Sequence, residues 1–186
     1  MATYGFVYDQ NRCIGCNACQ MACKDGHDLE LGMFFRRAAT LEYLHPQGQL
    51  CIAHYSGGCN HCQDPACAAN CPTGAMHRQS DGTVAVDAGR CVGCGTCTWV
   101  CPYGAPKLSR KTGRSMKCDA CIERRQAGKE PLCVDACLTH CLRFVDLDTL
   151  PEAEKAQYTN TLPFLPATEK TRPNLMILKK EGLYGE

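Results

Sequence analysis

Cysteine dominates this sequence: eighteen of the 186 residues are cysteine, and sixteen of these fall into four groups of four. Such an excess indicates either a disulfide framework or a metal protein. The first and third groups are spaced CxxCxxCxxxC, the second CxxCxxxxCxxxC, and the fourth has eleven residues between its second and third cysteines. In chain order the groups are Cys13, Cys16, Cys19, Cys23; Cys59, Cys62, Cys67, Cys71; Cys91, Cys94, Cys97, Cys101; and Cys118, Cys121, Cys133, Cys137.

The first and third groups match the cysteine run of bacterial ferredoxins. Three thiolates two residues apart wrap three corners of one cubane cluster within a single tight loop. Small residues such as Gly15 and Gly93 let backbone N–H groups approach the cluster sulfurs. The fourth cysteine leaves the loop and caps a cluster held by a partner group. The spacing therefore predicts four [4Fe–4S] clusters held by sixteen cysteines.

Structural zinc and a disulfide framework are the alternatives. Zinc sites bring two CxxC pairs together, which suits the second and fourth groups taken alone. The first and third groups crowd three ligands where zinc takes two plus two. A disulfide framework needs an oxidising compartment, and Met1 to Gln10 have neither the basic nor the apolar segment of a signal peptide. Iron–sulfur clusters are favoured over both.

Two cysteines lie outside the four groups. Cys51 is in an alternating stretch that predicts a strand, and we interpret it as a small buried side chain. Cys141 follows Cys137 by four residues and stays an alternative capping ligand. Trp99, inside the third group, is expected to pack against a cluster. Because sixteen cysteines suffice, His61 is interpreted as a tuning or structural residue rather than a ligand.

The order of the groups predicts two ferredoxin-like halves. A turn at Asp81-Gly82 and a strand at Thr83–Val86 separate the second and third groups, as in a two-cluster bacterial ferredoxin. The first and fourth groups flank this module and must pair, with Gly5–Tyr8 and Leu142–Val145 as closing strands. We expect an α+β fold with one ferredoxin-like module nested inside the other. The expected parts are 1–23 with 118–145 as the outer half, 24–58 as an inserted hairpin, 59–117 as the inner half, and 146–186 as an extended C-terminal arm.

The added segments carry weaker signals. Met33–Leu44 and Leu50–Tyr55 flank a turn at Pro46–Gly48 and predict a hairpin, and Pro106–Met116 predicts another. Within the first, Phe34–Arg37 is either a docking surface for a partner subunit or two core phenylalanines beside two solvated arginines. The arm has four prolines, and whether it lies on its own domain or on a neighbour stays open.

Charge and hydropathy bear on partners. No apolar run approaches the roughly eighteen residues needed to cross a bilayer. The formal net charge of +1 gives no sign of a surface for nucleic acid. Four oxidised clusters, each about −2 with its thiolates, would bring the net charge to roughly −7. We expect neither direct membrane insertion nor a nucleic-acid partner.

Taken together, the four groups resemble the iron–sulfur B subunit of dimethyl sulfoxide reductase-type molybdenum enzymes. The likeness runs from Tyr4 to about Asp146 and is carried by YGFVYDQNRCIGC, CNHCQDPAC, CPYGAP and KCDAC. The eleven-residue gap of the fourth group is its most specific feature. Corresponding subunits of polysulfide, formate and nitrate enzymes belong to the same family.

The resemblance implies a ligand set for each cluster. It also implies a proline after Cys137, where this sequence has Leu138, and that departure leaves Cys137 and Cys141 both open as the cap. All four cysteines of the third group are present, although some relatives have tryptophan at one of them. The implied sets are Cys13, Cys16, Cys19 with Cys137; Cys118, Cys121, Cys133 with Cys23; Cys59, Cys62, Cys67 with Cys101; and Cys91, Cys94, Cys97 with Cys71.

The resemblance also implies partners. It indicates a non-catalytic electron-transfer subunit beside a large subunit with a molybdenum or tungsten bis-pterin cofactor. A membrane anchor that exchanges electrons with quinone, or a soluble carrier, is the second partner. The implied complex is membrane-associated and in the periplasm by co-export with the catalytic subunit, with the cytoplasm as the alternative. A free-standing soluble polyferredoxin is the competing function.

Overall fold

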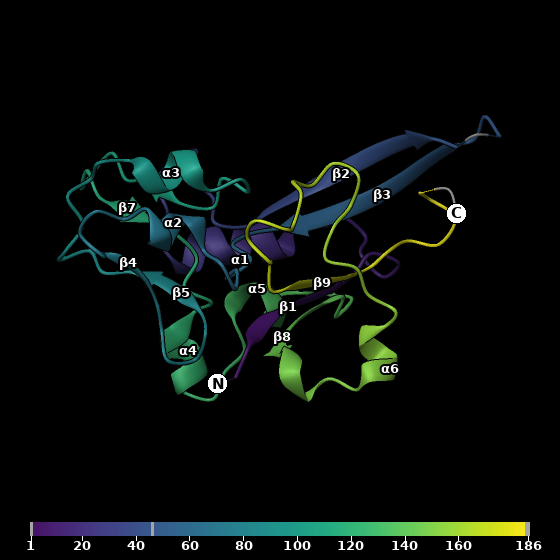
Figure 1. The fold of residues 1–186 in the computed structure, drawn as a ribbon. Coiled ribbons are helices and arrows are strands. Elements are labelled where there is room, and N and C mark those ends of the chain that lie inside the picture. Colours follow the sequence, from purple (N-terminus) through teal and green to yellow (C-terminus); the bar gives the residue numbers. More distant parts are fainter. Residues whose placement is uncertain (1, 46, 185–186) are drawn as a thin grey trace.

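The computed structural model describes residues 2–45 and 47–184 and has a small mixed sheet at its centre (Figure 1). Strand β1 (Tyr4–Asp9) is the middle strand, between β8 (Leu142–Asp146), which is antiparallel to it, and β9 (Leu175–Leu178), which is parallel. The predicted pairing of the N-terminal strand with the strand after the fourth cysteine group is confirmed. Strand β9 was not predicted.

The central strand is buried on both faces, which explains its continuous apolar sequence. Phe6 and Tyr8 point to one face of the sheet and Val7 to the other, and all three side chains are almost completely buried. Phe6 packs against Phe144 of β8 with ring centroids 4.8 Å apart, and Tyr4 stacks on the same ring. This core holds the two ends of the cysteine-bearing region together.

Two helices bring cysteines to the edge of this core. Helix α1 (Ala18–Gly26) packs against α5 (Leu132–Asp135), and a Cβ on Gly26 would lie 2.4 Å from a methyl of Leu132. A small residue at Gly26 therefore allows the close approach. Helix α1 has nine residues, and no helix in the described part of the chain is long and apolar enough to cross a membrane.

A long hairpin projects from the body of the molecule (Figure 1). Strand β2 (Arg37–Leu44) pairs antiparallel with β3 (Leu50–Gly57), which confirms the predicted hairpin. Its expected turn includes residue 46, which lies outside the described residues. Leu44 and Leu50, paired at the far end, are exposed, as is Ile52.

The region from the second to the fourth cysteine group contains short elements, to the left in Figure 1. The predicted strand after the Asp81 turn is confirmed, and so is the predicted hairpin within 106–116. The elements are α2 (Ala66–Ala69), β4 (Met76–Arg78), β5 (Val84–Val86), α3 (Thr96–Val100), β6 (Lys107–Leu108), β7 (Ser115–Met116) and α4 (Ile122–Gln126).

The C-terminal segment returns to its own chain. After the 3-10 helix η1 (Leu147–Thr149) and α6 (Glu152–Lys155), it runs back along the body and ends in β9. Asn174, almost completely buried, donates to the carbonyl oxygen of His61 at 2.8 Å. Arg172 pairs with Asp64 on the same face. The question left open by the sequence is answered: the arm lies on its own domain.

Candidate iron–sulfur cluster sites

One cavity, beside α2, is lined by four cysteine side chains from two sequence groups. Burial, followed by the neighbouring Cys59 thiol, raises the pKa of Cys62 to about 12. Burial likewise raises the pKa of Cys67 to about 12. Thiols held together in so dry a place lose their protons only when a metal replaces them. We call these four the Cys59 set: Cys59, Cys62, Cys67 and Cys101.

A second cavity, beside α3, is lined by the remaining cysteines of the same two groups. Three come from the third group, and Cys71 comes from the end of the second. The two groups therefore exchange their last cysteines, as cross-ligation requires. We call these four the Cys91 set: Cys71, Cys91, Cys94 and Cys97.

Hydrogen-bond donors point at the sulfurs of the Cys91 set. The backbone N–H of Met76 donates to Cys71 Sγ and that of Ser115 to Cys91 Sγ, both at 3.3 Å. The Ser115 hydroxyl also lies 3.2 Å from Cys97 Sγ. Donors of this kind stabilise thiolates and tune cluster potentials. Ser115, the first residue of β7, lies outside the cysteine groups and contacts two of their sulfurs.

A third set forms where α1 meets α5 and the start of α4. Cys118 packs against the core cluster that contains Cys23. Burial, and then the neighbouring thiols of Cys23 and Cys121, raise the pKa of Cys133. The backbone of Cys121 and of the preceding Ala120 is left-handed, with φ of 50° and 58°. Such backbone is costly for residues other than glycine and is typical of functional sites. We call these four the Cys118 set: Cys23, Cys118, Cys121 and Cys133.

His27 lies against the Cys118 set. Its Nε2 is 3.7 Å from Cys121 Sγ and its Nδ1 4.0 Å from Cys23 Sγ. The ligand atoms of His27, Asp119 and Cys121 lie within 4.8 Å of one another. Since Cys121 already belongs to the Cys118 set, we interpret His27 as a neighbour of that set and not as part of a separate metal site.

The fourth set contains one cysteine too many. Cys137 Sγ and Cys141 Sγ are 3.4 Å apart, and both are buried in the core cluster against which Cys13 and Cys19 pack. Contact with the Cys141 thiol lowers the pKa of Cys13. Cys16 is exposed in the loop between Cys13 and Cys19. We call these the Cys13 set: Cys13, Cys16, Cys19 and Cys137, with Cys141 as the alternative cap.

The four sets fit [4Fe–4S] clusters. Each provides four thiols, which is the ligand set of a cubane cluster. All eighteen cysteines are free, so the alternative of a disulfide framework finds no support. Backbone N–H groups point at sulfurs in the Cys91 and Cys118 sets, as the ferredoxin loop requires.

Exposure differs sharply among the cysteines, all of which lie in the described ranges. Cys16 and Cys94 are exposed, and every other cysteine is at least half-buried. Exposed apolar side chains lie close in the sequence to each of the two exposed cysteines. Trp99, on α3 close to Cys94, is 82% exposed, so the expectation that it packs against a cluster is wrong. The exposed apolar neighbours are Ile14 and Met21 near Cys16, and Val92 and Trp99 near Cys94.

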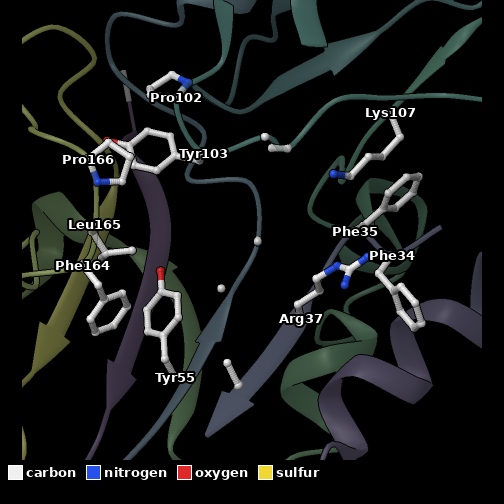
Figure 2. Close-up of a pocket in the computed structure, with 15 residues that line it drawn as sticks. Phe34, Phe35, Arg37, Tyr55, Pro102, Tyr103, Lys107, Phe164, Leu165 and Pro166 are labelled. Atoms are coloured by element: carbon white, nitrogen blue, oxygen red, sulfur yellow. The ribbon is translucent and has the colours of Figure 1, made fainter. Parts of the chain in front are cut away.

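The segment Phe34–Arg37 fits neither of its two interpretations as a whole. Phe35 is buried, while Phe34 and Arg37 line an open pocket of about 360 Å³ together with Tyr55 and Lys107. Figure 2 shows the Arg37 side chain beside Phe34, and its guanidinium lies 4.9 Å from the centroid of that ring. Arg36 is only 4% exposed, so the interpretation of two solvated arginines is wrong for it.

Sequence reasoning missed the buried polar residues around the cysteine sets. Lys117 is buried beside the Cys59 set and donates to the carbonyl oxygens of Val84 and Cys118. Ser56 lies 3.3 Å from Cys19 Sγ. The position of Lys117 directly before a ligand cysteine is a usable signal. Nothing in the local pattern distinguishes Arg36 or Ser56 from ordinary residues of an exposed hairpin.

Two family models for 4Fe-4S proteins match this chain. Residues 51–147 match the family model described as 4Fe-4S dicluster domain, and residues 4–25 match the one described as 4Fe-4S binding domain. The first match covers the second, third and fourth cysteine groups, and the other covers the first group.

Curated relatives match over nearly the whole chain. The B subunit of anaerobic dimethyl sulfoxide reductase from Haemophilus influenzae is 42% identical, over 95% of this chain and 89% of the relative. The protein of the same name from Escherichia coli is also 42% identical, over 94% and 87%. The B subunit of polysulfide reductase from Wolinella succinogenes is 33% identical, over 97% of both proteins.

Proposed function

The chain belongs to the family of iron–sulfur B subunits of dimethyl sulfoxide reductase-type enzymes, and we propose that it carries electrons through four [4Fe–4S] clusters. It is the electron-transfer subunit of a reductase complex and not the catalytic one. The clusters would supply one-electron redox chemistry. The residues of the chain hold them, exclude water and adjust their potentials.

The observation that carries the proposal is the grouping of the cysteines. We assign one cluster to each of the Cys13, Cys118, Cys59 and Cys91 sets. In each set three ligands come from one sequence group and the last from another. Cys101 beside the Cys59 set and Cys71 beside the Cys91 set support this cross-ligation.

Cross-ligation also supports the nested plan. We propose that residues 1–23 and 118–145 form an outer ferredoxin-like half and residues 59–117 an inner one. The β1–β8 pairing and the α1–α5 contact support the outer half. Residues 24–58, with the projecting hairpin, and the C-terminal segment 146–186 are then additions to the two halves.

The four clusters form a single path in this proposal. Cys133 and Cys137, from neighbouring sets, are buried in one core cluster. After burial, the Cys59 thiol is the next cause that raises the pKa of Cys118, so these two sets are adjacent. Cys67 and Cys97 are buried together in a third cluster. The order of the sets along the path is therefore Cys13, Cys118, Cys59 and Cys91.

The two ends of this path support two different partners. Apolar side chains are exposed beside Cys16 at one end and beside Cys94 at the other, and such patches mark protein contacts. We propose that the Cys13 end meets a large catalytic subunit with a molybdenum or tungsten bis-pterin cofactor. The Cys91 end then meets the redox partner, a membrane anchor or a soluble carrier. We place the complex at the membrane on the periplasmic side, with the cytoplasm as the alternative.

Substitution of Cys23 tests this assignment. Serine is nearly isosteric with cysteine but a poorer iron ligand, so Cys23→Ser should convert the cluster of the Cys118 set to a three-iron form or shift its potential. The cluster on Cys13, Cys16 and Cys19 should stay cubane. Electron paramagnetic resonance at controlled potentials, on the complex purified without oxygen, distinguishes the two.

The unsubstituted complex provides the reference. It should contain about sixteen iron and sixteen sulfide per chain and a co-purifying large subunit. A reproducible value near twelve iron, or stoichiometric zinc, contradicts the four-cluster assignment. If Cys23→Ser alters only the cluster of its own sequence group, the nested pairing is wrong. A loaded chain that never co-purifies with a large subunit indicates a free polyferredoxin.

A further inference from the structure

Arg36 is a buried cation with no acidic partner. Its side chain is 4% exposed, and none of the ion pairs found in residues 2–45 and 47–184 includes it. The guanidinium donates to the carbonyl oxygen of Ser56 at 3.0 Å and to its hydroxyl at 3.1 Å. It also lies over the ring of Phe6, 4.3 Å from the centroid. These contacts satisfy hydrogen bonds but provide no opposite charge.

Arg36 lies between two cysteine sets. On one side Ser56 connects it to Cys19 of the Cys13 set, because the Ser56 oxygen is 3.3 Å from Cys19 Sγ. That oxygen accepts from Arg36, so its own hydrogen is free to donate to the sulfur. On the other side a side-chain contact joins the guanidinium to Cys133 of the Cys118 set.

The opposite charge for Arg36 can come only from thiolates of the neighbouring cysteine sets. Cys133 contacts the guanidinium on one side, and Cys19 lies beyond the Ser56 hydroxyl on the other. An isolated buried charge is very costly, so buried charges in proteins are paired. In this protein the opposite charge comes from the cysteine sets once they are thiolates that hold clusters.

We propose that Arg36 is an electrostatic positioning residue between the two clusters of the Cys13 and Cys118 sets, and that it raises the reduction potentials of both. The inference rests on the proposed assignment of clusters to these sets. Each reduction adds one negative charge to a cluster, and a fixed buried cation stabilises that added charge more strongly than water-screened cations do. Arg36 thereby keeps both clusters reducible at the end of the path that meets the catalytic subunit.

The test is a redox titration followed by electron paramagnetic resonance on the purified complex. Arg36→Gln should weaken the reduction equilibrium of both clusters at least tenfold, which is about 59 mV for a one-electron couple. The clusters of the Cys59 and Cys91 sets should shift much less. Arg36→Lys, which keeps the charge, should restore most of the potential.

Arg37→Gln is the matched control. Arg37 is the next residue and is exposed, so its removal changes the net charge equally but acts through solvent. It should leave all four potentials unchanged. An equal shift in Arg36→Gln and Arg37→Gln, or no shift in a fully loaded Arg36→Gln complex, overturns the inference.

Ser56→Ala keeps the proposal testable if Arg36→Gln fails to load iron. This change removes the hydroxyl between Arg36 and Cys19 and leaves the buried charge in place. It should lower the potential of the Cys13-set cluster alone, because the buried charge still acts on both clusters. An equal fall in the potential of the Cys118-set cluster overturns the inference. If the unsubstituted complex gives no cubane signals, the proposed function is wrong instead.

Discussion

At the scale of single residues, Cys137 and Cys141 compete for one position. Their sulfurs are 3.4 Å apart, so a small side-chain rotation brings either to the same iron. In each sequence group the last cysteine follows the third after three intervening residues, and Cys137 keeps this spacing. We therefore expect Cys137 to be the cap.

Paired serine substitutions separate the two cysteines. Cys137→Ser should convert the Cys13-set cluster to a three-iron form or shift its potential, because serine binds iron less well than cysteine. Cys141→Ser, the matched control, should leave that signal unchanged. Electron paramagnetic resonance of the two loaded complexes makes the comparison, and the reverse result identifies Cys141 as the ligand.

The cysteines that we assign to the clusters were predicted from their spacing, whereas the buried polar residues beside them, such as Arg36, were not. Cysteine spacing reflects the size of a cubane, which is a local geometric constraint. The burial of Arg36 depends on the charge of a group that the sequence does not contain. A pattern of side chains therefore gives no reason to place an arginine in the interior. Trp99 was misjudged for a related reason, because its surroundings are completed by another protein in our proposal.

At the scale of secondary structure, β9 is the element that sequence reasoning missed. It has four residues and pairs in parallel with a strand more than 160 positions away. No turn residue or alternating pattern in the sequence indicates such a pairing. The hairpins were predictable because their two strands are neighbours in the chain, and their turns contain glycine.

The contribution of β9 to stability is testable at Ile177. Its side chain is fully buried against the central sheet, so Ile177→Ala should cost about 2–5 kcal/mol. For a chain of this length that corresponds to a fall in melting temperature of roughly 5 °C or more. Thermal melts of the loaded protein, followed by circular dichroism at one scan rate without oxygen, measure it.

Met176→Ala is the control for that change. Met176 is the adjacent residue of the same strand, points to the other face and is only half-buried. Its replacement should lower the melting temperature distinctly less. If the two variants have the same melting temperature, β9 does not stabilise the sheet through its buried face.

At the scale of the whole molecule, the cysteine sets are part of the hydrophobic core. Each of the three core clusters found in the described residues contains cysteine, and one of them contains Cys133, Cys137 and Cys141 together. Without clusters, these positions contribute small side chains around cavities. Much of the free energy of folding must therefore come from cluster binding.

Removal of iron should consequently unfold the protein. Treatment with an iron chelator under reducing conditions should abolish the cooperative thermal transition and expose the backbone to hydrogen exchange. Reducing conditions without chelator are the control and should leave both unchanged. A compact apo form that still melts cooperatively contradicts this expectation.

The parallel pairing of β1 with β9 also has a consequence in time. Strand β1 leaves the ribosome more than 160 residues before β9, one of its two neighbours in the sheet. Because the ribosome adds about 5–20 residues per second, β9 follows β1 after an interval on the order of ten seconds or more. Synthesis must therefore pass all eighteen cysteines and reach β9 before the central sheet is complete. Iron and sulfide delivered earlier than that meet a β1 strand that still has one unpaired edge.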